Sequence, residues 1–277
     1  FCWQNSPKGS RLILSPLIRK IFKDSFVNSV KRIYDSNLRN EESIRNLPRF
    51  KEYHTKLDHY SVSFPDAQSF LSMRDEIWHN QSYFFECRKK CPFIIDCGSN
   101  IGLSVLYFKQ LFPKSHILAF EPDPFLCKYL TQNVRTNGLT QREMVPKAVW
   151  SSNTSLPFLS DGADGGRVSS VSNGISVEAV MLKQFLDRDV DFLKIDIEGN
   201  ELEVLKSCSD SLNKVSKIFL EYHSFKDSNQ QLSNLLKILE DNHFRYFLNS
   251  ATQRTKPFAF KSNEEMDLQV NIYAWKN

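Results

Sequence analysis

Residues 93–102, which read FIIDCGSNIG, constrain the fold more than any other part of this 277-residue chain. The apolar run Phe93–Ile95 is typical of a strand that is buried on both faces of a sheet. The run stops at Asp96, a glycine-containing turn follows, and apolar residues at helical spacing resume over Leu103–Leu111. A strand, a tight turn and a helix in this order form the opening unit of a nucleotide-binding α/β domain.

The turn reads D-C-G-S-N-I-G, which does not fit the dinucleotide fingerprint GxGxxG. Its first residue, Asp96, would repel a pyrophosphate but would suit a ligand that carries an ammonium group. S-adenosylmethionine has an ammonium and a sulfonium and no phosphate. The motif D-x-G-x-N-x-G after a buried strand therefore resembles the first motif of Rossmann-like methyltransferases. A purely structural turn with a helix cap is the alternative.

The next apolar run, His116–Phe120, predicts a second buried strand that ends at Glu121. Glu121 lies 19 residues after Gly102, close to the roughly 20-residue offset at which an acid meets the ribose in nucleotide-binding βαβ units. The two oxygens of a carboxylate can accept hydrogen bonds from both ribose hydroxyls. We therefore predict that Glu121 binds a ribose. The alternative, a solvated acid at a strand end, does not account for the spacing.

Apolar periodicity predicts further strands and helices along the rest of the chain. Residues 143–150 indicate one strand that Pro146 interrupts, and the Ser-, Gly- and Asn-rich residues 151–174 indicate a loop or hairpin that covers the site. Other strands are expected at 60–65, 175–180, 190–197, 216–222, 244–248 and 270–275, and other helices at 66–78, 125–137, 182–186 and 230–242. The predicted class is α/β, with a seven-stranded, mostly parallel sheet flanked by helices and an antiparallel last strand, as in the Rossmann-like class I methyltransferase fold.

Two of the predicted core strands deliver polar side chains to their carboxyl ends, where ligands bind in open α/β sheets. Lys194 and Asp196 share one side of the 190–197 strand because side chains alternate along a strand. Glu221 and His223 share one face of the strand that begins at residue 216. A buried salt bridge and a structural histidine are the alternatives, and the rule for the sheet edge favours a shared site.

Four segments together resemble the FkbM-type S-adenosylmethionine-dependent methyltransferase family. The stretch K-I-D-I-E-G-x-E is the most specific part of the resemblance, which runs from about Tyr60 to the C-terminus. The segments are IIDCGSNIGLSVLYFKQLFP (94–113), AFEPDP (119–124), DFLKIDIEGNELEVL (191–205) and FLEYHS (219–224).

The resemblance implies how the cofactor, S-adenosyl-L-methionine, would bind. Glu121 matches the acid that binds the ribose, and Asp123 and Ala148 fall where the adenine would lie. The residues that match the family's glycine loop, which is implied to hold the methionine half, are Asp96, Gly98, Ser99, Asn100 and Gly102.

The resemblance also implies O-methylation, because the family is known for methylating hydroxyls of sugars and natural products. Asp196, Glu198 and His223 match polar positions that face the transferable methyl group. We predict His223 as the general base, oriented or assisted by Glu221, while Asp196 and Glu198 would position the acceptor or carry the proton instead. The three acids could instead form an oxygen-rich divalent-metal site. Their geometry cannot be read from the sequence, so no metal is assigned.

Two other functions are compatible with a sheet of this kind. An oxidoreductase of the NAD type would need the GxGxxG turn, which is absent. A non-enzymatic adaptor would show a degraded cofactor site, whereas the Asp, Gly and Glu positions are all present.

The acceptor, a small-molecule or glycan hydroxyl, is expected to contact residues 83–85, 151–174 and 249–269. The sequence of these segments does not indicate which acceptor binds.

Residues 1–59 are predicted to form a basic, mostly helical extension ahead of a methyltransferase domain over 60–277. Residues 1–60 carry twelve Lys and Arg against six Asp and Glu, and the rest of the chain carries 24 against 26. A nucleic-acid groove is therefore not predicted for the domain. The amphipathic pattern over 11–35 suits either a membrane surface or packing on a neighbouring domain, and packing is the commoner use.

The six cysteines are scattered and show no zinc-ligand spacing. We interpret them as reduced thiols, which is typical of a cytoplasmic protein. No apolar run reaches the roughly 18 residues of a membrane span. The oligomeric state is not predicted.

Overall fold

The computed structural model describes two compact units, residues 1–47 and 48–277. In the first unit, residues 41–45 are helical and Arg45 pairs with Glu41 at 2.6 Å. The predicted basic helix over 11–35 lies outside the described residues. These are 41–140, 144–163, 165–168, 174–226, 228–251, 256, 258–259 and 266–276.

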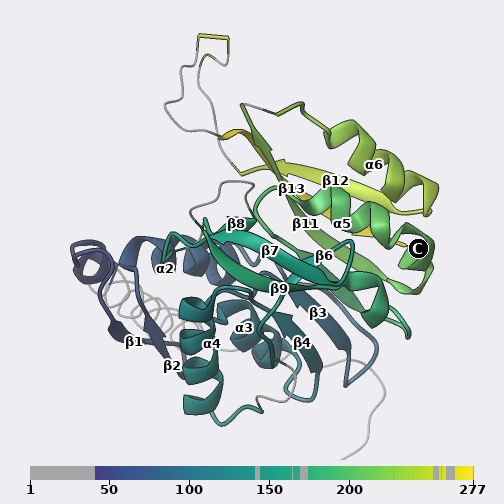
Figure 1. The fold of residues 1–277 in the computed structure, drawn as a ribbon. Coiled ribbons are helices and arrows are strands. Elements are labelled where there is room, and N and C mark those ends of the chain that lie inside the picture. The colour runs from purple at the N-terminus through teal and green to yellow at the C-terminus, as the bar shows by residue number, and fades with distance from the viewer. Residues whose placement is uncertain are drawn as a thin grey trace, which may run out of the picture. The chain divides into compact units, whose positions relative to one another are not determined.

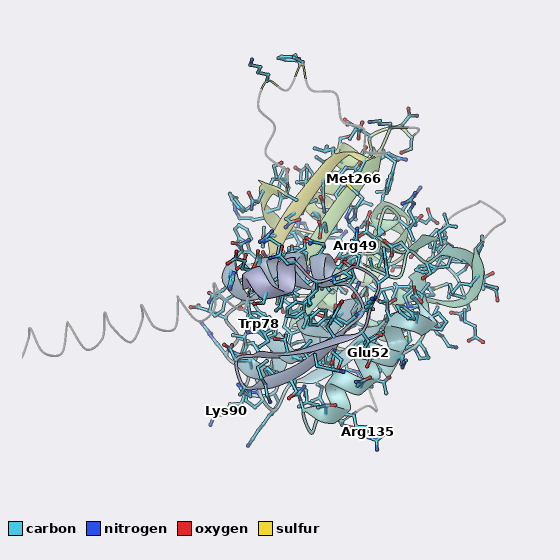
Figure 2. All side chains as sticks on the ribbon, turned by 90° about the vertical axis from the view of Figure 1, so that its left-hand side faces the viewer. Arg49, Glu52, Trp78, Lys90, Arg135 and Met266 are labelled. Atoms are coloured by element: carbon cyan, nitrogen blue, oxygen red, sulfur yellow. The ribbon has the colours of Figure 1, made fainter. Side chains whose placement is uncertain are left out.

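The second unit opens with a hairpin of β1 (Tyr53–Leu57) and β2 (Tyr60–Phe64), which pair antiparallel from Tyr53 opposite Phe64 to Leu57 opposite Tyr60. Arg49, labelled in Figure 2, donates to Asp66 just beyond the hairpin at 2.8 Å. Residues 48–59 therefore belong to the same compact unit as the sheet. The weak pattern before residue 60 hid a short strand in which partly buried and exposed side chains alternate.

A seven-stranded mixed sheet forms the centre of the second unit (Figure 1). β13 runs antiparallel to β11 and β12, as the sequence predicted for the last strand, and the other neighbouring strands pair parallel. The strands in spatial order are β12 (Arg245–Ser250), β13 (Met266–Trp275), β11 (Lys217–Phe225), β10 (Phe192–Ile195), β3 (Phe93–Cys97), β4 (His116–Phe120) and β5 (Met144–Val145).

Helices and aromatic side chains bury both faces of this sheet. On one face, apolar side chains of α5 and α6 share a core with β3, β10 and β11. On the other, Phe85 stacks on Phe192 at 4.5 Å and Tyr83 packs edge-on against Phe219. The helices are α2 (Ala67–Arg74), the π-helix η1 (Asp75–His79), α3 (Leu103–Leu111), α4 (Pro124–Thr136), the 3₁₀ segments η2 (Leu182–Phe185) and η3 (Ser209–Lys214), α5 (Glu201–Ser207) and α6 (Leu232–Asp241).

The central strand β3 confirms the reading of residues 93–102. Ile94 and Ile95 are both fully buried, so consecutive side chains that point to opposite faces each meet a covered surface. The α/β class predicted from the sequence is therefore confirmed.

The prediction of one strand over 143–150 is wrong. β5 stops at Val145, and β6 (Ala148–Trp150) belongs to a second sheet with β9 (Ile175–Met181), β7 (Thr154–Leu159) and β8 (Arg167–Val168). Pro146 lacks a backbone N–H for the ladder, and the chain leaves the main sheet at this residue. Part of the predicted 151–174 hairpin is the antiparallel pair β7–β8, which places Phe158 opposite Val168.

Among the described residues, no helix combines the length and apolar character needed to cross a bilayer.

The five cysteines in the described part of the chain are free thiols, and Cys97 and Cys208 are buried in the core. Burial is the main cause that raises the pKa of the Cys208 thiol to about 12, so it is protonated at neutral pH.

Candidate functional site

A cavity of about 390 Å³ lies at the carboxyl ends of β3, β4, β10 and β11. The strand ends contribute Gly98, Glu121, Asp196 and Glu221 to its wall. This is the edge at which ligands bind in open α/β sheets. Apolar wall residues include Leu103, Phe120, Leu126, Val149, Trp150 and Phe158.

The turn after β3 brings backbone close to the end of β10. Gly98 has a φ of 87°, and a Cβ at this position would lie 1.9 Å from the carbonyl oxygen of Asp196. Gly98 and Ser99 both donate their backbone N–H to the carbonyl of Phe120, at 3.0 and 2.9 Å. The turn thus joins β3, β4 and β10 at one point, and only glycine fits there.

Glu121 lies at the cavity with both carboxylate oxygens oriented by backbone. Its Oε2 accepts from the N–H of Asn100 at 2.8 Å, and its Oε1 accepts from the N–H of Asp123 at 2.9 Å. Burial outweighs these two bonds and raises the pKa of Glu121 to about 7. Each oxygen retains a second lone pair for a ligand hydroxyl.

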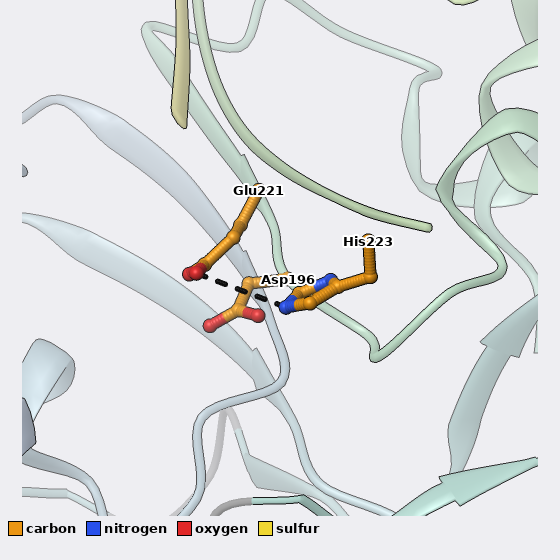
Figure 3. A group of neighbouring side chains, drawn as sticks. All are labelled: Asp196, Glu221 and His223. Carbon is orange, nitrogen blue, oxygen red and sulfur yellow. Dashed lines mark ion pairs between the residues drawn. The ribbon is translucent and has the colours of Figure 1, made fainter. Parts of the chain in front are cut away.

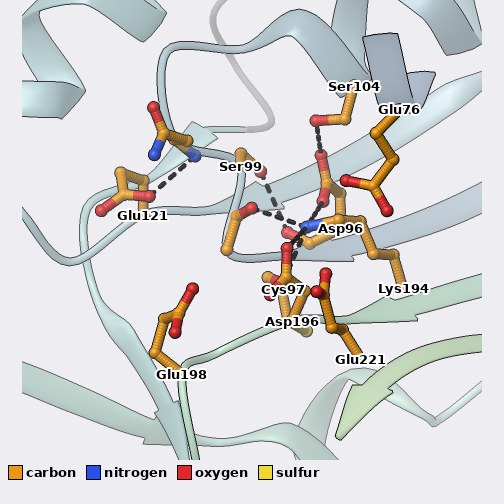
Figure 4. A network of polar contacts seen from close by, with 12 residues as sticks. Glu76, Asp96, Cys97, Ser99, Ser104, Glu121, Lys194, Asp196, Glu198 and Glu221 are labelled. Carbon is orange, nitrogen blue, oxygen red and sulfur yellow. Dashed lines mark hydrogen bonds and ion pairs between the residues drawn. The ribbon is translucent and has the colours of Figure 1, made fainter. Parts of the chain in front are cut away.

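Asp96 does not line the cavity, contrary to the direct ligand contact that the sequence suggested. It is fully buried, accepts from Ser104 Oγ at 2.5 Å, and lies 3.5 Å from Lys194 Nζ (Figure 4). The Lys194 ammonium also lies 3.1 Å from Asp196 and donates to the carbonyl of Gly98 at 2.7 Å. Asp96 therefore lies behind the cavity wall and helps to hold the buried cation of Lys194, which is part of the wall.

The charge of Lys194 is stabilised by these neighbours. Burial opposes the ammonium, but the attraction of Asp196 and Asp96 outweighs it and raises the pKa of Lys194 above its usual range. Lys194 lines the cavity, so the cation links the first glycine turn to the acids at the other end.

Of the other predicted cofactor residues, Gly102 and Asp123 support the fold, whereas Ala148 lines the cavity. Gly102 begins α3 with a φ of 88° and packs against Leu130, where a Cβ would lie 2.6 Å from Cδ1. Asp123 caps α4 by accepting from the N–H of Phe125 at 2.8 Å and is almost fully buried. Ala148 lines the cavity, as do the predicted loop residues Gly98, Ser99 and Asn100.

Asp196, Glu198 and Glu221 line the opposite end of the cavity. Glu198 has the left-handed φ of 59°, which is strained for a residue with a side chain. Its Oε2 lies 3.5 Å from His223 Nε2. Glu221 Oε1 lies 3.7 Å from the same nitrogen (Figure 3). Four of the residues predicted to be catalytic are thus brought together, although His223 itself lies behind the wall.

His223 differs from the predicted general base. Its side chain is 1% exposed, and Nδ1 lies 3.0 Å from Glu201 Oε1. Burial opposes the imidazolium, but the hydrogen bond and charge of Glu201, together with Glu198 and Glu221, raise the pKa of His223 well above its usual range. This shift and the position of the ring behind the cavity wall both argue against His223 as the base that takes the acceptor's proton. The side chain that orients it is Glu201, which the sequence analysis did not assign.

Glu76 on η1 is the acidic cavity residue that sequence reasoning missed. It accepts from Asn271 Nδ2 at 3.1 Å. Burial, followed by repulsion from Asp196, raises its pKa to about 7. The sequence held a signal for this position. Glu76 lies three residues after Met73 and directly before Ile77, so the predicted helix turns it toward the side of Met73, a residue of the apolar face.

The three segments expected to contact the acceptor all contribute to the cavity wall. Tyr83 comes from the first, Phe158 and Val168 from the second, and Met266 and Gln269 from the third. The sequence thus identified which parts of the chain meet here.

The chain matches the family model described as the methyltransferase FkbM domain over residues 96–246, more than half of its length. It is 30% identical over 203 residues to methyltransferase sdnD of Sordaria araneosa, which covers 59% of this chain and 77% of that protein. It is 26% identical over 158 residues to 2-O-methyltransferase NoeI of Sinorhizobium fredii, with 48% and 64% covered. It is 27% identical over 137 residues to hexuronic acid methyltransferase AglP of Haloferax volcanii, with 48% and 56% covered.

The residues matched by the family model include the glycine turn after β3, Glu121 and the acidic end of the cavity. The relatives that the chain resembles are all named methyltransferases. The chain therefore belongs to the FkbM methyltransferase family.

Proposed function

We propose that this protein transfers a methyl group from S-adenosylmethionine to a hydroxyl of a sugar or another small metabolite. The observation that carries the proposal is a single cavity with a ribose-type acid, Glu121, at one end and the acids Asp196, Glu198 and Glu221 at the other. The strand order, with β13 antiparallel, supports a Rossmann-like class I methyltransferase fold.

The cavity residues fit the cofactor in charge and in shape. Glu121 has acceptor capacity for both ribose hydroxyls. The turn after β3 lacks the GxGxxG pattern that holds a pyrophosphate, which argues against a nicotinamide dinucleotide. Ala148, Val149 and Phe158 provide a small and apolar wall of the kind that suits adenine. Ser99 and Asn100 would hold the methionine half, while Asp96 would act through Lys194.

When bound, S-adenosylmethionine supplies a methyl group on a positively charged sulfur. In the reaction, a bond forms between the acceptor oxygen and the methyl carbon, and the carbon–sulfur bond breaks with its electron pair left on sulfur. The acceptor oxygen also loses its proton. Holding this oxygen in line with the methyl group supplies much of the rate. Asp196, Glu198 and Glu221 are the chain's groups that would orient the hydroxyl and receive the proton.

The acceptor class is supported by the names of two relatives. NoeI is named a 2-O-methyltransferase and AglP a hexuronic acid methyltransferase. An acceptor with several hydroxyls also suits a cavity end that is rich in hydrogen-bond acceptors.

The test measures binding and transfer separately. Calorimetry should show S-adenosylhomocysteine binding to the full chain at one site, with no binding of NADH. A panel of monosaccharides and hexuronic acids is then incubated with methyl-labelled S-adenosylmethionine, and methylated products are detected by mass spectrometry. Binding of NADH but not of S-adenosylhomocysteine would favour the oxidoreductase. Binding of neither would favour the adaptor.

A further inference from the structure

We propose that Asp196, Glu221 and His223 form a binding site for one divalent cation beside the acceptor end of the cavity. Each of the three residues offers one donor atom, and these atoms all lie within 4.8 Å of one another (Figure 3). The chemical role of this cation site rests on the proposed function, whereas the arrangement of its three donor atoms does not depend on that function. It departs from the sequence analysis, which assigned no metal.

The orientation of His223 is the observation that points to a ligand. Its Nδ1 is held by Glu201 at 3.0 Å, whereas its Nε2 is buried and makes no hydrogen bond to any residue that the structure describes. A buried polar atom without a partner is costly and rare. Histidines that bind metals characteristically donate the other ring N–H to a carboxylate, which fixes the ring and makes the free nitrogen a better ligand.

Glu201 is itself fixed as an orienting residue. Its Oε1 also accepts from the backbone N–H of Gly199 at 2.8 Å, and its side chain is 1% exposed. The imidazole is therefore held by a group that cannot rotate away into solvent. The result is a ring nitrogen aimed at the acids of the cavity, 3.5 Å from Glu198 and 3.7 Å from Glu221.

The surrounding charge favours a cation. Asp196, Glu198, Glu221 and Glu76 all line the same cavity. Lys194 lies near Asp196, but its ammonium is shared with the buried Asp96 and the carbonyl of Gly98. A divalent ion would offset the excess of carboxylates at this end.

The distances require only a small adjustment. Donor atoms about 2.2 Å from an ion can be at most about 4.4 Å apart, so the three side chains need to close by a few tenths of an ångström. One imidazole nitrogen with two carboxylates suits a cation such as Mn²⁺, because carboxylates favour harder ions and imidazole favours later first-row metals. Positions left open would face the cavity and its acceptor.

The cation would give this end of the cavity a chemical role in activating the acceptor. A hydroxyl held beside a divalent cation loses its proton more readily, because the ion stabilises the alkoxide. The proton would pass to Glu198, which lines the cavity, is not one of the three ligands and has a side chain that is 20% exposed to solvent.

Binding of Mn²⁺ to the full metal-free chain tests the site without any turnover. Free Mn²⁺ is followed by its electron paramagnetic resonance signal during titration, and we expect one bound ion per chain. Asp196→Asn, Glu221→Gln and His223→Gln should each weaken binding at least about tenfold. Glu203→Gln, at an exposed position on α5, is the matched control and should bind Mn²⁺ like the wild type.

A second readout needs no variant. In the wild type, pulsed resonance spectra of bound Mn²⁺ should show coupling to an imidazole ¹⁴N nucleus, and absence of this coupling would overturn the assignment of His223. If all three ligand variants bound Mn²⁺ with the affinity of the wild type, the ion would lie elsewhere and the proposed site would be wrong. Wild-type protein that binds S-adenosylhomocysteine but no Mn²⁺ at millimolar concentration would overturn the cation site alone. Mn²⁺ binding without S-adenosylhomocysteine binding would support the site and overturn the proposed function.

Discussion

Gly98 and Asp196 approach so closely that a Cβ on the glycine would lie 1.9 Å from the aspartate's carbonyl oxygen. The two residues end neighbouring parallel strands, β3 and β10, whose register aligns Asp96 with Lys194 and Cys97 with Ile195. This contact sets the separation between the first turn and the acidic end of the cavity. It makes the size of residue 98 a determinant of the whole site.

Gly98→Ala should therefore disrupt both the fold and the site. A positive φ alone costs a residue with a side chain about 1–3 kcal/mol, and the clash with backbone adds to this. We expect a loss of more than about 3 kcal/mol in the free energy of urea unfolding, together with loss of S-adenosylhomocysteine binding. Gly138→Ala is the matched control, because Gly138 has a φ of 69° but no atom of the described residues within 4 Å of its Cβ position. Equal losses in the two variants would mean that the contact with Asp196 is unimportant.

Glu121→Ala should weaken S-adenosylhomocysteine binding at least about tenfold while the protein remains folded. The change removes two charge-assisted hydrogen bonds to the ribose, each worth about 1.5–3 kcal/mol. Calorimetry of wild type and variant in one buffer measures the difference, and Glu203→Gln serves as an exposed control. Unchanged affinity in a folded Glu121→Ala protein would remove the residue from the ribose site.

The affinity for S-adenosylhomocysteine should rise with pH between 6 and 8. Burial raises the pKa of Glu121 to about 7, so the ligand-free protein favours the protonated acid below pH 7. Binding through both oxygens needs the carboxylate. The affinity at pH 6 should therefore be about tenfold lower than at pH 8, with a plateau above the pKa. Calorimetry across this range checks the slope, and Glu121→Gln should flatten it. A slope that persists in this variant would assign the titration to another group.

Lys194→Met should destabilise the protein by about 3–5 kcal/mol, because it leaves Asp96 buried without its cation. Urea unfolding followed by circular dichroism measures the loss. Lys183→Met provides the comparison, since Lys183 pairs with Asp210 at 2.6 Å but with side chains that are 42% and 65% exposed. An exposed pair of this kind contributes at most about 1 kcal/mol. A loss at Lys194 no larger than the loss at Lys183 would show that the buried cation is not needed to stabilise Asp96 in the fold.

Local patterns in the sequence determined the central elements and the edge at which the site forms. The apolar run Phe93–Ile95 is typical of a strand covered on both faces, and Glu121 follows the second strand at the spacing of a ribose-binding acid. Alternation along β11 likewise placed Glu221 and His223 on one side. These signals depend on neighbouring residues alone, so they can be read without the fold.

Tertiary structure decided which of these groups meet the cavity and in which state of charge. Asp96 and His223 both belong to the predicted site, yet Asp96 faces Lys194 and His223 faces Glu201, behind the wall. Glu76 reaches the acids from η1, a segment far away in the sequence. The pKa values of Glu76 and His223 depend on burial and on charges contributed by other strands and helices. Periodicity cannot supply that information, because it arises only when β3, β10, β11 and η1 pack together.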